Sequence, residues 1–214
     1  SPDLGIVPMS KEVANIATIA ANQLEAAGAE VTSDIPDFSG ALAGFQTLRA
    51  VLLGTMMGEL LEKERDRIAE DIVGNIERGF DVTPQQLFEA ERVRWALYHE
   101  MIKFFNTHDV LICPSASISA FPVELPFVNE IDGKTCETYI DWFAITFAIT
   151  MTSCPVISIP CGFTDDGLPV GLQVVGKPRG EATLLQAAKW MEDLFCIADT
   201  LPIEPRLNDT PNKI

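Results

Sequence analysis

The chain has 214 residues, 47% of them hydrophobic, so it can bury a sizeable core and fold as a single domain without a disulfide or a metal ion. Its formal net charge of −16 would repel a nucleic-acid duplex or an anionic membrane surface, and we expect neither as a partner. The five cysteines are odd in number and lack a C-x-x-C pair, and no signal-peptide pattern opens the chain; we therefore expect a reducing compartment, the cytoplasm.

The first residues predict a helix followed by a short strand. Ser10 is placed to cap a helix over residues 11–28, whose apolar residues recur at steps of three and four along one face. Gly28 is placed to end this helix. The sequence AEVTS, residues 29–33, then has the composition of a short strand.

Residues from about 39 to 107 form a segment that we expect to be helical. Its first part carries Gly54, Gly58 and Gly74, at which the helical pattern can break. The run GELLEKERDRIAEDIVGNIERG in the same part is densely charged, as solvated helix faces are. A separate helix follows Thr83, which is placed as N-cap with Gln86 at the third helical position, the pattern of a capping box.

A sheet-bearing segment runs from about residue 108 to residue 196. It combines short apolar strands with a long irregular loop and two helices. In chain order the expected elements are a strand at 109–114, a loop at 115–136, an apolar helix at 137–153, strands at 156–159 and 170–175 joined by the turn TDDGLP, and a helix at 180–195. Helices that alternate with short apolar strands predict an α/β fold with a partial mixed sheet covered by helices.

No complete catalytic constellation can be read along the chain. It has no G-x-S-x-G, S-x-x-K or H-E-x-x-H motif, no zinc-spaced Cys and His cluster, no P-loop and no G-x-G-x-x-G, so we predict neither a metal nor a cofactor. His99 and His108 fit surface or helix-end positions better than a Ser-His-Asp triad, which only an arrangement in space can reveal. Cys154 and Cys161 fit buried structural thiols better than nucleophiles, because no base is near them in sequence.

The stretch CPVISIPCGFTDDGLPVGLQVVGKPRGEATLLQAAKWME, from Cys154 to Glu192, resembles the carboxyl-terminal part of the amidase signature family. The matching positions are Pro155, Ser158, Pro160, Gly162, Gly167, Leu168, Pro169, Gly171, Gln173, Gly176 and Leu184. DVLICPSA is similar to a strand of that family, and the first 31 residues are similar to the segment that follows its catalytic core. The resemblance covers essentially residues 1–214 and implies the C-terminal half of a single amidase-signature domain.

The resemblance also implies where the chemistry lies. Members of the family hydrolyse amides through a Ser–cis-Ser–Lys triad, with an acyl-enzyme and backbone N–H groups that hold the oxyanion. That triad sits on a Gly/Ser-rich core upstream, and no Gly-Ser-Ser run occurs in this chain. We therefore expect no catalytic residue here, and a chain that is inactive alone but supplies sheet strands and the pocket wall of an amidase acting on a small carboxamide.

Other functions stay open at this point. Within the family, a glutamine amidotransferase subunit is the second expectation. In a different class, the chain would be a non-catalytic module whose open sheet edge pairs with a partner, which would allow a homodimer. The identity of the amide and the oligomeric state do not follow from the sequence.

The resemblance implies that the helix before the Pro-containing strand lines the acyl channel. Four of its residues are spaced by three and four on one face and are the predicted substrate-binding residues, with ordinary core packing as the equal alternative: Ile140, Phe143, Phe147 and Thr150. The family often has Asn where this chain has Thr150, and Gly where it has Ser153. Asp141 lies near the position at which glutamine-using members carry a recognition Asp, although its spacing to Pro155 differs.

Overall fold

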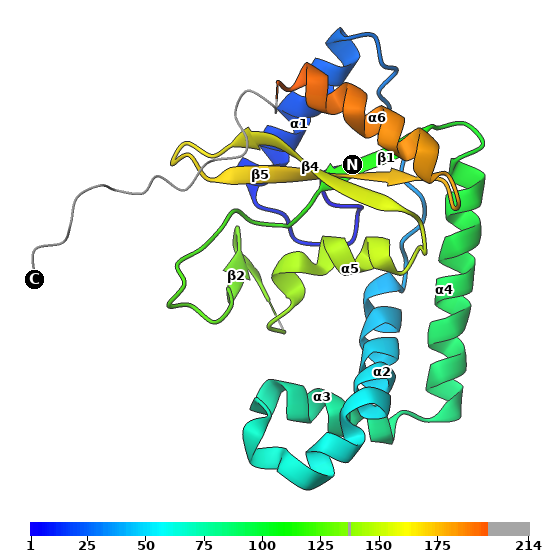
Figure 1. The fold of residues 1–214 in the computed structure, drawn as a ribbon, viewed down its shortest axis with the longest axis vertical. Helices are drawn as coiled ribbons and strands as arrows, with labels where there is room; N and C mark the ends of the chain where they lie inside the picture. The colour runs from blue at the N-terminus through cyan, green and yellow to red at the C-terminus, as the bar shows by residue number, and fades with distance from the viewer. Residues whose placement is uncertain (137, 197–214) are drawn as a thin grey trace, which may run out of the picture.

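The computed structural model describes residues 1–136 and 138–196, in which helices surround a small sheet and a helical hairpin extends away from it (Figure 1). The α-helices are α1 Lys11–Ala26, α2 Ala41–Glu64, α3 Glu70–Asp81, α4 Pro84–Phe104, α5 Ala144–Thr150 and α6 Glu181–Leu194. The strands are β1 Val110–Pro114, β2 Glu130–Ile131, β3 Lys134–Thr135, β4 Val156–Phe163 and β5 Pro169–Gly176, and the 3₁₀ turns are η1 Arg65–Arg67 and η2 Asp141–Phe143.

Strand β5 is the centre of the main sheet and pairs antiparallel with β1 on one side and with β4 on the other. The α/β class is confirmed, but the strands that the structure describes pair only antiparallel, so no mixed sheet is seen among them. Strands β4 and β5 must pair antiparallel, because the short turn at residues 164–168 that joins them can connect only antiparallel neighbours. Gly167 in this turn has a φ of 82°, in the left-handed region that favours glycine.

The two faces of the sheet are covered by different helices, because strand side chains alternate between faces. Leu172 and Val174 of β5 pack in a hydrophobic layer with Leu184 of α6 and with residues of α1. Val175 of β5 and Leu111 of β1 pack in a second layer with residues of α2, α4 and α5. Figure 1 shows α1 and α6 on one side of the sheet and α5 on the other. The core therefore consists of two layers separated by the sheet.

Helices α2 and α3 form the hairpin that extends away from the sheet (Figure 1). Helix α2 runs through Gly54 and Gly58 without interruption, and α3 runs through Gly74, so the expectation of a break at these residues is wrong. Small residues here let the helices cross closely: a Cβ on Gly79 of α3 would lie 2.1 Å from the carbonyl oxygen of Ala50, and one on Gly54 would lie 3.6 Å from Cα of Gly79. A glycine inside a helix costs only about 1 kcal/mol relative to alanine, which the packing of two helices can offset.

Three expected elements differ in the structure. The irregular loop expected at 115–136 contains the short antiparallel pair of β2 and β3. The expectation of a strand at 29–33 is wrong, because these residues connect α1 to α2 without pairing with a strand. The helix expected at 137–153 is shorter, since its α-helical part begins at Ala144 and ends at Thr150, and position 137 lies outside the described residues. Composition alone cannot decide whether a short apolar run finds a strand partner or continues a helix.

The predicted start of α4 is confirmed in detail. Thr83 Oγ1 accepts a hydrogen bond from the Gln86 N–H at 3.3 Å, and Gln86 Oε1 accepts one from the Thr83 N–H at 2.9 Å. Pro84 occupies the first helical position, where no N–H is needed. The capping box could be predicted because all of its partners lie within four residues.

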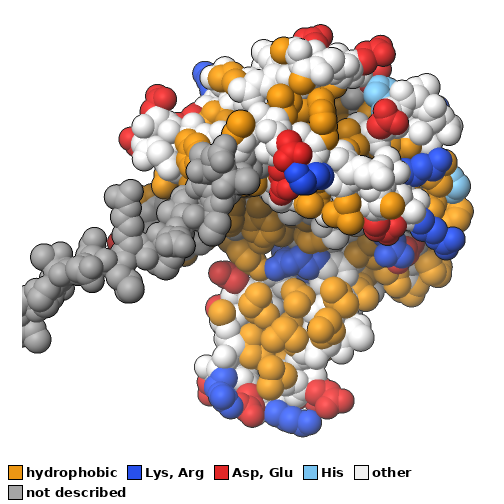
Figure 2. Space-filling model, turned by 45° about the horizontal axis from the view of Figure 1, so that its top comes forward, with side chains coloured by type: hydrophobic (Ala, Val, Ile, Leu, Met, Phe, Trp, Pro, Cys, Tyr) orange, Lys and Arg blue, Asp and Glu red, His pale blue; other side chains and the backbone are white. Residues whose placement is uncertain are grey.

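The hairpin exposes several hydrophobic side chains. Leu52, Met56 and Phe80 are 56%, 72% and 61% exposed, and Figure 2 shows hydrophobic side chains spread over this lobe at the bottom of the view. Within the described part of the chain, no helix combines the length and the apolar character needed to cross a membrane.

We expect Gly79→Ala to lower the free energy of unfolding by about 1–3 kcal/mol, because the added Cβ forces α3 away from α2. Gly74→Ala in the same helix is the matched control, since a Cβ there meets no atom within 4 Å. It should raise the free energy of unfolding by up to about 1 kcal/mol. Urea unfolding of both variants measures the difference, and equal midpoints would contradict this account of the helix crossing.

Candidate functional site

The four residues predicted to bind substrate divide between the core and the surface. Ile140 and Phe147 are buried in the core layer that includes α5. Phe147 stacks on Phe45 of α2 with ring centroids 4.2 Å apart, and Phe143 meets Phe147 edge to face at 6.0 Å. Thr150 is exposed, and its Oγ1 donates to a backbone carbonyl one turn earlier. The structure thus brings three of the four together, and their contact with a substrate stays a prediction.

A cavity of about 660 Å³ adjoins this aromatic cluster. Its wall comes from the loop after β1, from η2 and from strands β4 and β5. Phe121 and Trp142 line it and meet edge to face at 5.3 Å, and Trp142 meets Phe143 in the same way at 4.8 Å. Because Ser115 and Ser158 also line it, we name it the serine cavity.

Ser115 and Ser158 meet across the central strand of the sheet. Ser158 of β4 lies opposite Gln173 of β5, and Ser115 extends the pairing of β1, its N–H donating to the Gly171 carbonyl oxygen at 2.8 Å. The two Oγ atoms are 2.6 Å apart, a hydrogen bond in which either can donate. A Cβ on Gly171 would lie 2.8 Å from Ser115 Oγ and 3.1 Å from Ser158 Oγ. The serine pair therefore depends on a glycine at this position.

The loop that follows β1 is held in place by hydrogen bonds from three directions. The buried Gln173 side chain donates to the last carbonyl oxygen of β1 at 3.0 Å. Thr146 Oγ1 of α5 donates to the Ser115 carbonyl oxygen at 2.7 Å, and the Ser117 N–H donates to the Trp142 carbonyl oxygen at 3.1 Å. These bonds fix the cavity wall relative to β5, α5 and η2.

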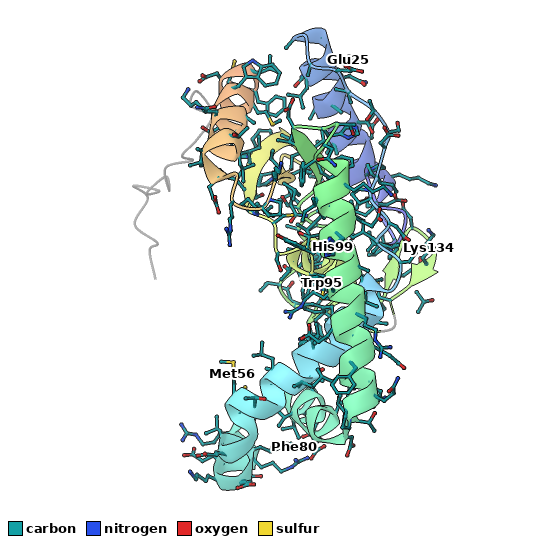
Figure 3. All side chains as sticks on the ribbon, turned by 90° about the vertical axis from the view of Figure 1, so that its right-hand side faces the viewer. Glu25, Met56, Phe80, Trp95, His99 and Lys134 are labelled. Atoms are coloured by element: carbon teal, nitrogen blue, oxygen red, sulfur yellow. The ribbon has the colours of Figure 1, made fainter. Side chains whose placement is uncertain are left out.

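No base lines the serine cavity, as far as the described residues go. The residues that line the serine cavity include no histidine, lysine or carboxylate. His99 packs against Trp95 on α4 with ring centroids 4.6 Å apart (Figure 3), and His108 stacks on Phe104 at 4.1 Å. The two hydroxyls can bind a carbonyl or an amide, but nothing among these lining residues activates them as nucleophiles.

Burial makes the cysteine thiols near the sheet weak acids. It raises the pKa of Cys113 to about 12 and the pKa of Cys161 to about 11. Burial also raises the pKa of Cys154. The thiolate is the nucleophilic form of cysteine, so these directions favour structural roles for Cys154 and Cys161.

The carboxylate beside the aromatic cluster has a structural partner. The Asp141 carboxylate accepts hydrogen bonds from the N–H and the hydroxyl of Thr138, the N–H at 2.8 Å. These bonds join the first residue of η2 to the segment that enters it. Within residues 1–136 and 138–196, no three His, Cys, Asp or Glu side chains gather in a way that could hold a metal ion.

Ser115, Phe121 and Trp142 are absent from the predicted site. They lie well before β4 and β5 in the sequence and reach the cavity only because β1 pairs with β5 and η2 follows the intervening loop. One signal was available, since Ser115 falls within the DVLICPSA stretch that resembles a family strand. Trp142 lies within residues 137–153, the helix that the resemblance places along the acyl channel, but it is not among the four residues predicted from that helix. Phe121 carries no such signal.

Comparisons with known proteins agree on one family. The family model described as Amidase matches residues 1–185. An acylamidase of Rhodococcus erythropolis is 27% identical over 207 residues, which are 95% of this chain and 43% of the relative. A glutamyl-tRNA(Gln) amidotransferase subunit of Thermodesulfovibrio yellowstonii is 29% identical over 191 residues, which are 86% of this chain and 37% of the relative. The chain thus spans less than half the length of these curated relatives.

Solved structures share the fold. A bacterial aryl acylamidase of the amidase signature family superposes with a TM-score of 0.76 at 20% identity, over 95% of this chain and 45% of that chain. A 6-aminohexanoate cyclic dimer hydrolase superposes with a TM-score of 0.73 at 21% identity, over 90% of this chain and 43% of that chain. At these identities the likeness concerns the fold alone.

We expect Gly171→Ala to separate Ser115 from Ser158 and to lower the free energy of unfolding by about 1–3 kcal/mol. Ser158→Ala is the control, because it removes one hydroxyl without adding volume, and it should cost about 1 kcal/mol or less. Urea unfolding measures both. A loss for Gly171→Ala no larger than that for Ser158→Ala would show that the close approach is unimportant.

At pH 8 about one Cys161 side chain in a thousand should be ionised, because burial raises its pKa to about 11. A raised pKa keeps the thiol protonated, so its alkylation should be slow at pH 8 and should accelerate as the pH rises. Iodoacetamide labelling of each cysteine, followed by peptide mass spectrometry, measures this with the exposed Cys196 as reference. Equal labelling rates for Cys161 and Cys196 at pH 8 would contradict the raised pKa of the partly buried Cys161.

Proposed function

Because the chain belongs to the amidase signature family, we propose that it forms the carboxyl-terminal part of an enzyme that hydrolyses a carboxamide through an acyl-enzyme. The observation that carries this proposal is the family match over residues 1–185. The chain would supply three sheet strands and the serine cavity to the wall of the active site. The nucleophile would come from the part of the relatives' length that this chain does not span.

The serine cavity suits a small carboxamide. Phe121 and Trp142 offer apolar surface against which an aliphatic or aromatic acyl group can pack. The hydroxyls of Ser115 and Ser158 can donate a hydrogen bond to the amide carbonyl and accept one from the amide N–H. Small-molecule sites commonly combine apolar surface with a few placed polar groups in this way.

The predicted substrate-binding residues would support this cavity from behind. Phe143 packs against Trp142, and Phe147 lies between Phe143 and the stacked ring of Phe45. In the proposed enzyme this aromatic series sets the position of the Trp142 ring, which faces the acyl group. Thr150 would contact substrate only from the exposed end of α5.

A glutamine amidotransferase is the alternative within the same family. It is supported by the likeness to the glutamyl-tRNA(Gln) amidotransferase subunit. The two functions share the amide-cleaving step and differ in the fate of the ammonia, which a hydrolase releases and an amidotransferase passes to an acceptor. Ammonia release from a simple carboxamide without an acceptor favours the hydrolase.

A non-catalytic module that pairs with a partner is the candidate from a different class. One observation favours it: within the described residues, β4 pairs with β5 only, so its outer edge is open. Val156 and Phe163 at the ends of β4 are 39% and 43% exposed. Open strand edges readily pair with other strands, so this function would give a homodimer through β4. A monomeric protein in solution would count against it.

We expect the protein expressed from its complete gene to release ammonia from a carboxamide such as benzamide, and residues 1–214 alone to show no turnover above background. The reason is that the serine cavity has hydroxyls but no activating base. An ammonia assay with both proteins measures this. Turnover by residues 1–214 alone that Ser115→Ala abolishes would overturn the proposal, because the nucleophile would then lie in this chain.

A further inference from the structure

Helix α4 carries a row of exposed aromatic side chains on the face opposite to its buried residues. Phe88 and Trp95 are 56% and 67% exposed, and Trp95 and His99 lie on successive turns of the helix (Figure 3). Positions 88, 92, 95 and 99 are spaced by four and three, so they share one face. The buried residues of α4 lie on the other face: Ala90, Leu97 and Met101. A helix that packs on a core with one face normally has polar residues on the other, so the packing of α4 on the core does not explain this aromatic row.

The aromatic row lines a groove of about 1090 Å³ along the outside of α4. The lining residues are six from α4, between Phe88 and Tyr98, and Ser153 from the turn that follows α5. We name it the α4 groove, and it shares no lining residue with the serine cavity. Small-molecule sites enclose most of the surface of their ligand. A groove along one helix, with side chains as exposed as Phe88 and Trp95, suits a protein surface better.

The α4 groove is rich in the residue types that stabilise protein interfaces. Trp, Tyr and Arg are enriched among the residues that contribute most of the binding energy at interfaces. The groove contains Trp95, Tyr98, Arg92 and Arg94. The rings of Trp95 and Tyr98 stack with centroids 6.4 Å apart, so they offer one continuous aromatic surface to a partner.

The groove is also positively charged within an acidic chain. Arg94 pairs with Glu91 at 2.7 Å, whereas Arg92 takes part in none of the ion pairs found among the described residues. Arg92 is exposed and lies between Phe88 and Trp95 on their shared face. The chain has 31 acidic and 15 basic residues, so an acidic surface would be repelled by most of the chain and attracted to this groove. The expected partner surface is therefore apolar, with a carboxylate placed to pair with Arg92.

Two observations indicate that this partner surface belongs to the same polypeptide. The chain spans 43% and 37% of the two curated relatives, and the match covers 45% and 43% of the two solved chains. The α4 groove also adjoins the open edge of the sheet, because Ser153 comes shortly before Val156, the first residue of β4. Within the described residues the outer edge of β4 has no partner strand. Further strands added at that edge would bring their connecting segments close to the α4 groove.

We propose that the α4 groove is an interface at which the remaining part of the same protein packs against this chain. The docked surface is apolar around Phe88 and Trp95 and places a carboxylate against Arg92. This inference goes beyond the proposed function, since it concerns how the protein is assembled and not how an amide is cleaved.

Hydroxyl-radical footprinting of the protein expressed from its complete gene tests the interface directly, because the oxidation rate of a tryptophan follows its exposure. Trp95 should be oxidised severalfold more slowly than free N-acetyltryptophanamide in the same sample. Trp190 of α6, which is 41% exposed, is the matched control and should react faster than Trp95. A rate for Trp95 equal to or above that of Trp190 would match the exposures in this structure and overturn the inference.

The same measurement after about hundredfold dilution identifies the occupant of the groove. Dilution weakens association between molecules but not packing within one polypeptide. Protection of Trp95 that is unchanged by dilution supports the inference. Protection that is lost on dilution would assign the groove to a second copy of the protein and overturn it.

Charge variants test the acidic character of the docked surface. Arg92→Glu should speed up the oxidation of Trp95 severalfold, because it places a second acid against the expected carboxylate. Arg179→Glu makes the same charge change at an exposed arginine in the turn before α6 and should leave the Trp95 rate unchanged. Arg92→Gln removes the charge without adding repulsion; it replaces Arg92→Glu if that variant does not fold, and its effect should be smaller in the same direction. A Trp95 rate that no folded Arg92 variant changes would refute the acidic surface.

The footprint separates this inference from the proposed function. Protection of Trp95 in a protein that hydrolyses no amide would support the interface and refute the hydrolase. An active hydrolase in which Trp95 reacts at least as fast as Trp190 would support the proposed function and refute the interface.

Discussion

Strand β5 carries the constraint on which both the fold and the site depend, because it is paired on both sides and covered on both faces. Its Leu172 and Val174 fill the hydrophobic layer that includes α1 and α6. On the opposite face, Gly171 leaves room for the two serine hydroxyls to meet, and Gln173 anchors the end of β1. One short strand thus needs large apolar side chains on one face and room for Gly171 and Gln173 on the other.

In the proposed enzyme, this chain would contribute one part of the active site. The described residues offer apolar surface and hydrogen-bonding groups there: the aromatic rings of Phe121 and Trp142 and the Ser115–Ser158 hydroxyl pair. The described residues that line the serine cavity include no base that could activate a nucleophile. In the proposed enzyme, this part would therefore contribute to substrate recognition, and bond cleavage would depend on residues outside these 214.

Features that could be predicted from the sequence are those whose partners are close along the chain. The capping box of Thr83 and Gln86 and the hairpin of β4 and β5 belong to this group. Continuous α2 could not be predicted, because the cost of Gly54 in a helix is offset by packing against α3, which the local pattern does not reveal. The serine cavity could not be predicted for a similar reason. Ser115 and Trp142 come together only through the pairing of β1 with β5 and the path of the following loop.

The central claim is that this chain shapes the site while the nucleophile lies elsewhere in the same protein. The most direct test is to label the protein expressed from its complete gene with a fluorophosphonate, which reacts with activated serines, and to locate the adduct by peptide mass spectrometry. The account predicts an adduct on a serine outside these 214 residues. An adduct on Ser115 or Ser158, or an active protein without any serine adduct, would contradict it.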